Sequence, residues 1–156
     1  MQLALADTQV APVPERITSA PSPLPRAALP EEERRLLRLL RRRAALTCLR
    51  PRIEPFLFCA ALEATPERDA DACLDAVLRV APHALGRRFR MHHPSAAGVS
   101  FDEAWLLGLL RAYRRGDHRS AAFALASRCR HALRRPFGAL ANGLATRLDP
   151  HTLEAF

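Results

Sequence analysis

Between residues 30 and 149, apolar side chains recur every three or four positions, and no stretch alternates polar and apolar residues with a period of two. The first spacing places side chains on one face of an α-helix, whereas a half-buried strand needs the second. The pattern therefore favours helices throughout this range. We predict an all-α fold, a compact bundle of five to six helices with no sheet.

The first predicted helix begins after Pro30 and ends before Pro51. Glutamates fill its first turn and arginines follow toward its end, the charge order that complements the helix dipole. Its leucines share one side with Ala44 and Cys48. Five arginines share the other side and are predicted to face solvent: Arg34, Arg35, Arg38, Arg41 and Arg42.

Prolines, glycines and capping residues divide the rest of the bundle into helices. Ser100 and Glu103 form the strongest local signal, a capping box that starts a wide apolar helix containing Phe101 and Trp105. Pro55 is predicted to open a short helix, and Thr65-Pro66 to open a third helix that runs to about Val80 and is ended by Pro82 and Gly86. Gly116-Asp117 is predicted to separate the two helices of an antiparallel hairpin, and Pro136 to start the last helix.

Residues 1–29 are rich in proline and have no amphipathic period, so we predict a disordered or extended arm. Residues 30–149 form the bundle domain, and residues 150–156 form a tail. The arm lacks the features of a secretory signal, and no apolar run is long enough to cross a bilayer. We therefore expect a cytoplasmic protein and no membrane partner.

All 24 basic residues are arginine, and the formal net charge is +8. Part of this excess fits the codon bias of a GC-rich bacterial genome, but the positive field attracts acidic partners whatever its origin. The four cysteines contain no closely spaced pair, and we interpret them as small buried side chains.

The segment GRRFRMHHP, residues 86–94, has three interpretations. Its arginines could contact phosphates while Phe89 stacks on a base. Alternatively, it is an interhelical loop anchored by Phe89 and Met91, which is the interpretation we favour. A metal site at His92 and His93 is the weakest, because adjacent residues seldom bind one ion and no other histidine adds a spaced ligand.

The predicted hairpin from Trp105 to Arg135 lacks the apolar positions that lock a DNA-reading helix-turn-helix, so we interpret it as a plain antiparallel pair. Phe123 falls on the polar side of its helix, beside Arg119 and Arg130. Either another segment, such as the N-terminal arm, covers this ring, or the ring anchors a partner.

The sequence contains no phosphate-binding glycine loop, no metalloprotease motif and no nucleophile elbow. Asp69, Asp71 and Asp75 are interpreted as solvated acids near a helix N-terminus. We therefore predict no enzyme, no cofactor, no metal and no small-molecule substrate.

The chain is thus predicted to be a small bacterial adaptor or regulatory protein that binds an acidic protein partner. The alternative is a nucleic-acid-binding protein that contacts phosphates through its arginines. The predicted partner-binding residues are Arg34, Arg38, Arg41, Arg42, Arg87, Arg88, Phe89, Arg90, Arg119, Phe123 and Arg130.

Overall fold

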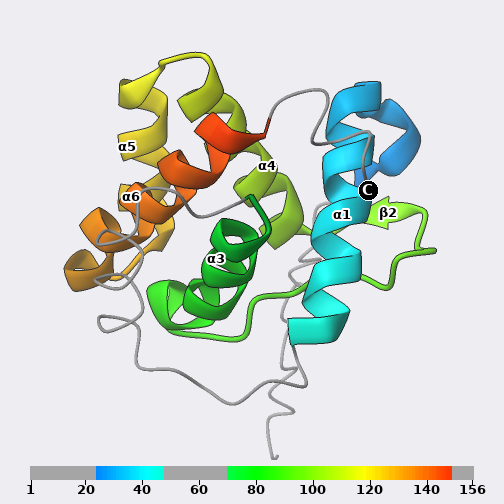
Figure 1. The fold of residues 1–156 in the computed structure, drawn as a ribbon, viewed down its shortest axis with the longest axis horizontal. Coiled ribbons are helices and arrows are strands. Elements are labelled where there is room, and N and C mark those ends of the chain that lie inside the picture. The colour runs from blue at the N-terminus through cyan, green and yellow to red at the C-terminus, as the bar shows by residue number, and fades with distance from the viewer. Residues whose placement is uncertain (1–23, 48–69, 149–156) are drawn as a thin grey trace, which may run out of the picture.

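The structure, a computed structural model, describes residues 24–47 and 70–148. These ranges hold five α-helices and one short strand pair, so the predicted all-α bundle is confirmed (Figure 1). In chain order the elements are β1 (Leu24–Pro25), the 3-10 turn η1 (Arg26–Ala28), α1 (Glu31–Thr47), α3 (Ala70–Leu85), β2 (Gly98–Val99), α4 (Phe101–Arg114), α5 (His118–Arg128) and α6 (His131–Arg147). Most of the predicted arm, the short helix after Pro55, the Thr65-Pro66 cap, Asp69, Cys48 and Cys59 lie outside the described residues.

Helices α3 and α4 lie between α1 on one side and the pair α5 and α6 on the other (Figure 1). Leucines at helical spacing fill the space between them, and Leu37, Leu40, Leu106 and Leu109 are fully buried, as is Phe137 of α6. Each such side chain contributes about 1.5 to 3 kcal/mol by leaving water. Cys73 and Cys129 are buried as predicted.

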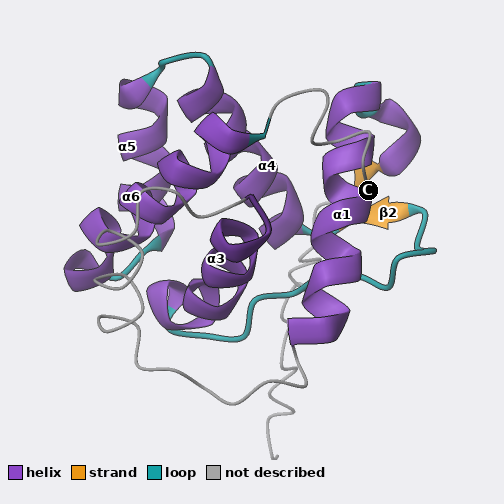
Figure 2. Cartoon of the chain, viewed as in Figure 1, coloured by secondary structure: helices purple, strands orange, loops and turns teal. Residues whose placement is uncertain are grey.

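The expectation of no sheet is wrong in one place. Leu24 pairs with Val99, and Pro25 pairs with Gly98, in an antiparallel ladder two residues long at the edge of the bundle (Figure 2). A pair this short has too few residues to show a period of two in the sequence. It joins the segment before α1 to the loop before α4, and Leu29 in this segment enters the core.

Two prolines lie inside helices rather than at their ends. Helix α3 passes through Pro82 to Leu85, and α6 begins at His131, well before Pro136. Proline removes one helical hydrogen bond, but the apolar residues packed on either side of Pro82 keep the helix continuous. Helix α3 ends at Gly86, whose φ of +69° is accessible to glycine at little cost.

The break between α5 and α6 falls at Cys129 and Arg130 and has no glycine or proline. The Arg134 guanidinium donates to the carbonyl oxygens of Cys129 at 3.1 Å and Ala126 at 2.9 Å. These bonds satisfy carbonyl groups that the end of α5 leaves without helical donors. The boundary therefore depends on a side chain from the next helix.

The predicted boundaries at Ser100 and at Gly116-Asp117 are confirmed. The Ser100–Glu103 capping box begins α4, and Gly116, with φ of +68°, ends it. The Asp117 side chain then accepts from the Ser120 amide at 3.0 Å and caps α5. In the described ranges, no helix has the length and apolar character needed to cross a bilayer.

Candidate functional site

Two adjacent acids at the start of α4, Asp102 and Glu103, are both buried and hold the surrounding segments in place. Glu103 closes the capping box by accepting from the Ser100 amide at 2.7 Å. Its other oxygen accepts from the His92 amide at 2.9 Å. Glu103 therefore both closes the capping box and fixes the loop of residues 86–97 to α4.

Arg41 of α1 completes the Glu103 cluster. Its Nε and Nη2 donate to the two Glu103 oxygens at 2.8 and 3.0 Å, and its guanidinium also donates to the carbonyl groups of Ala96 at 2.8 Å and Gly98 at 2.6 Å. Burial alone raises the pKa of Glu103, but these hydrogen bonds outweigh it and lower the pKa.

The prediction that Arg41 faces solvent and contacts a partner is wrong, because only 1% of this residue is exposed. Arg41 follows Leu37 by one helical turn, so it lies beside the buried face of α1. The four-residue spacing from Leu37 was the sequence feature that could have indicated the burial of Arg41. Its partner Glu103 lies 62 residues away, and nothing in the sequence pattern links the two.

Asp102 binds two arginines from different segments. Arg87 donates to both of its oxygens at 2.6 and 2.9 Å, and the Arg128 guanidinium donates to one of them. The Arg90 amide adds a bond of 2.8 Å. Burial alone raises the pKa of Asp102, but these donors lower it from 3.8 to about 2.

The loop after α3 confirms the interpretation as an anchored interhelical segment. Phe89 and Met91 are half-buried and pack against the core, so Phe89 is not a free ring for stacking. Arg88 and Arg90 are exposed. In the described part of the chain, neither of their guanidinium groups has a hydrogen-bond or ion-pair partner.

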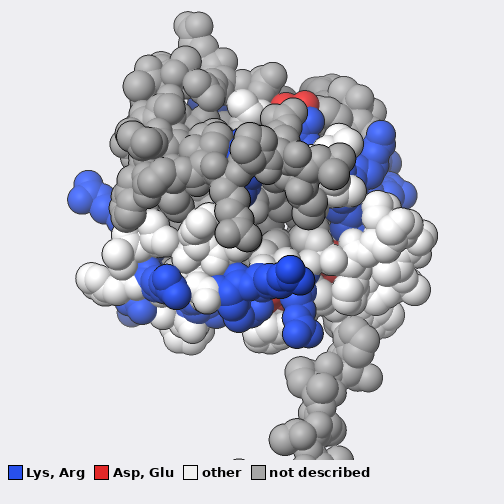
Figure 3. All heavy atoms as spheres, turned by 90° about the horizontal axis from the view of Figure 1, so that it is seen from below, with Lys and Arg blue, Asp and Glu red and all other residues white. Residues whose placement is uncertain are grey.

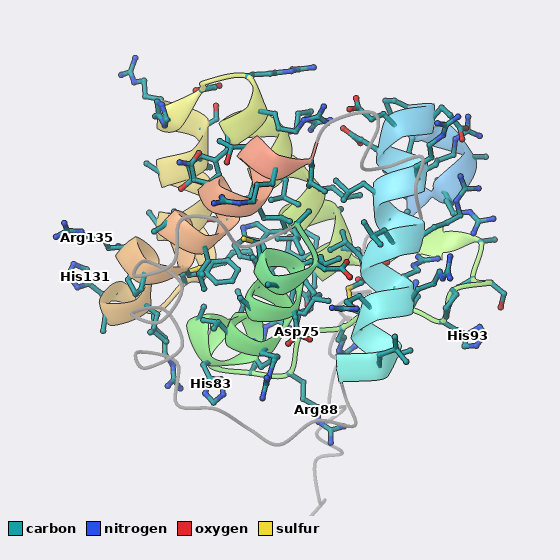
Figure 4. The ribbon with its side chains drawn as sticks, in the orientation of Figure 1. Asp75, His83, Arg88, His93, His131 and Arg135 are labelled. Atoms are coloured by element: carbon teal, nitrogen blue, oxygen red, sulfur yellow. The ribbon has the colours of Figure 1, made fainter. Side chains whose placement is uncertain are left out.

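Arg130 lies against the same loop. Its amide donates to the Ala84 carbonyl at 2.8 Å, and a Cβ added at Gly86 would lie 2.3 Å from its Nε. Five arginines therefore gather on one side of the molecule, which we call the lower basic face: Arg87, Arg88, Arg90, Arg128 and Arg130. Figure 3 shows arginines along this side, which is the side where Figure 4 places Arg88.

Phe101 is the exposed ring of this face, with 68% of its surface open to solvent. The sequence pattern includes it in a wide apolar helix, but it is the first residue of α4 and extends beyond the packed helices. The Arg128 guanidinium lies over its ring, 4.5 Å from the centroid. Neither residue is among the predicted partner-binding residues. No glycine or proline marks the end of α5 at Arg128, so the sequence contains no signal for this contact.

A depression of about 500 Å³ lies beside Phe101. Buried side chains of Val99, Ser100 and Asp102 belong to its lining, together with more exposed groups. Its lining residues are Arg87, Arg90, His92, Val99, Ser100, Phe101 and Asp102. Both the loop and the capping box thus contribute to one concave surface.

His92 and His93 point to different partners. His92 Nδ1 lies 3.1 Å from the Gly98 carbonyl oxygen, and His93 Nδ1 lies 2.7 Å from Ser95 Oγ. Figure 4 places His93 at the outer edge of the loop, and His83 and His131 elsewhere on the surface. Among the described residues, no group of three or more potential ligands is close enough to hold a metal ion.

The remaining predicted partner residues lie away from the depression. On α1, Arg34 and Arg38 bind Glu31 at 2.8 and 3.5 Å, while Arg42 is exposed. On α5, Arg119 is exposed and Phe123 is 76% exposed, so the described residues do not cover this ring.

The prediction that Asp75 is a solvated acid is wrong. Asp75 is buried in α3, and its Oδ2 lies 3.6 Å from Nη1 of Arg79. Asp71 is half-buried and lies 3.5 Å from Arg43. Both acids therefore have arginine partners.

Comparison with protein-family models, with curated proteins and with solved structures gives no match for this chain. Its function is therefore inferred from the residues described above.

Proposed function

We propose that this chain is a small cytoplasmic bacterial adaptor or regulatory protein that binds an acidic protein partner without catalysis. The observation that carries the proposal is the lower basic face, where two of the five arginines, Arg87 and Arg128, bind the buried Asp102 and the others lie on the adjoining segments. Asp102 contributes one negative charge against the five positive charges of this face, so a net positive field is left for a partner. Such a field speeds encounter with acidic surfaces and selects against basic ones.

The chemistry of the two carboxyl groups supports a binding role. A general acid or base works best when its pKa lies near the operating pH. The pKa of Asp102 is about 2, and the pKa of Glu103 is also lowered, so both groups stay ionised and paired at neutral pH. Their hydrogen bonds go to the protein's own arginines and loop amides, which is the arrangement of a structural support.

A direct test uses labelled poly-glutamate as the acidic probe and fluorescence anisotropy as the readout. We expect the double substitution Arg88→Ser and Arg90→Ser to weaken binding about tenfold, or about 1.4 kcal/mol. The matched control is Arg34→Ser with Arg38→Ser, which removes the same charge from α1. Equal losses in both double variants would contradict a localised face.

A second candidate, a nucleic-acid-binding protein, is favoured by the exposure of Phe101 next to Arg128. Exposed rings between guanidinium groups serve as stacking platforms for single strands. This candidate predicts a steep salt dependence, with a log-log slope of about −0.7 for each phosphate contacted on single-stranded DNA. A flat salt dependence on an oligonucleotide would exclude it.

A further inference from the structure

We propose that the depression beside Phe101 is the anchor point of the lower basic face, and that it receives an apolar side chain from a short acidic segment of the partner. This inference rests on the proposed function and adds where, and with what chemistry, the partner binds. It places the anchor at Phe101 and not at Phe123, the ring that the sequence pointed to.

The arginines of the lower basic face have two different roles. Arg87 and Arg128 are bound to Asp102 and therefore shape the depression. Among the described residues, the guanidinium groups of Arg88, Arg90 and Arg130 have no hydrogen-bond or ion-pair partner. Their three charges are uncompensated, and Arg90 also lines the depression, so the lower basic face is complementary to carboxylates flanking an anchor.

The apolar part of the anchor is already ordered. Arg128 is held by Asp102 and lies over both the Phe101 and Trp105 rings, with its guanidinium carbon 4.5 and 5.3 Å from their centroids. A ring fixed on one side loses little conformational entropy when a partner covers the other side. Aromatic side chains next to arginine are enriched among the residues that dominate interface energies.

The size of the depression favours a peptide anchor over a nucleic-acid strand. Sites for single strands follow the backbone along a groove for roughly 4 to 16 nucleotides. This depression is confined to seven lining residues at one end of α4 and has a volume of about 500 Å³. A depression of this size can receive a single apolar side chain of a peptide.

The experiment uses two labelled peptides, one with a single leucine between glutamates and one with serine in place of the leucine. Anisotropy is measured with the full chain and with the variants Phe101→Ala and Phe123→Ala. Both rings are exposed, so neither substitution removes core packing, and thermal melts confirm the fold. We expect Phe101→Ala to weaken the leucine peptide about tenfold, a loss of about 1.4 kcal/mol, and to leave the serine peptide unchanged. Phe123→Ala should change neither.

The outcomes separate this inference from the proposed function. If Phe123→Ala weakens the leucine peptide and Phe101→Ala does not, the anchor lies on α5 and the inference is wrong, while the acidic-partner proposal stands. If the leucine and serine peptides bind equally well, the face attracts charge alone and there is no anchor. If neither peptide binds but single-stranded DNA binds and depends on Phe101, both statements are wrong and the face is a stacking platform.

Discussion

Asp102 and Glu103 are neighbours in the sequence and are both buried, yet they support different parts of the molecule. Glu103 binds Arg41, and both side chains are enclosed, so this pair locks α1 and the loop to α4. Asp102 binds Arg128, whose side chain is 13% exposed, and Arg87, whose side chain is 47% exposed. One acid therefore stabilises the interior, and the other fixes the geometry of a surface. Breaking these two arginine-carboxylate clusters should therefore cost different amounts of unfolding free energy.

The largest expected effect is on the enclosed pair. Arg41→Ala leaves Glu103 charged and buried without its main partner, which should cost about 3 to 5 kcal/mol of unfolding free energy. Urea denaturation measures this loss. Arg88→Ala, at an exposed arginine whose guanidinium has no partner among the described residues, should change stability by less than about 0.5 kcal/mol. Similar losses for the two variants would show that the Arg41 pair is not a structural lock.

The surface-linked acid should be less costly to alter. Asp102→Asn keeps one acceptor but removes the charge that binds Arg87 and Arg128, and we expect a loss of about 1.5 to 3 kcal/mol. The same substitution should not weaken binding to an acidic probe as Arg88→Ser with Arg90→Ser does, because it removes a negative charge from the face and leaves Arg88, Arg90 and Arg130 in place. A loss of stability larger than that of Arg41→Ala would reverse the ranking of the two acids.

The pH dependence of stability should show the Asp102 pairing directly. Its folded pKa of about 2 lies below the ordinary value of 3.8, so the pairing stabilises the fold at pH values above about 4. This contribution, roughly 1 to 2 kcal/mol, is lost as the pH falls from about 4 to about 2. The difference in unfolding free energy between the protein and Asp102→Asn should therefore shrink across this range. A constant difference would show that the carboxylate charge contributes nothing.

The smallest expected effect is at Glu31, an exposed acid that also has arginine partners. It lies 2.8 Å from Arg34 and 3.4 Å from Arg35 on the solvent side of α1. Water and salt screen such pairs, so Glu31→Gln should cost less than about 1 kcal/mol. Added salt should reduce this loss further, and it should reduce the loss from Asp102→Asn much less. Equal salt sensitivity would mean that burial does not distinguish the two acids.

The features that the sequence predicted correctly are those whose physical cause is local. The capping box at Ser100, the turn at Gly116-Asp117 and the leucine face of α1 each depend on residues within a few positions of one another. The all-α class follows from the same short-range pattern. The basic loop at Arg87–Arg90 was also visible, because its composition alone marks it.

The errors have a common cause in long-range contacts. Pro82 does not end a helix and Pro136 does not start one, because packing against distant residues outweighs one lost hydrogen bond. Arg41 is buried because an acid 62 positions away receives it. Phe101 and Arg128 meet only when α4 and α5 pack side by side, so the site they form has no signature in either segment.

The chain contains a single tryptophan, and its position makes it a built-in optical probe. Trp105 stacks on Phe137 in the core at 5.9 Å between ring centroids, donates to the Ala124 carbonyl at 3.0 Å, and has the Arg128 guanidinium over its ring. Its emission should therefore respond to unfolding and also to any movement of Arg128. Unlabelled protein can therefore report when a partner occupies the surface next to Trp105. The excited-state lifetime of this one fluorophore should separate partner binding from unfolding.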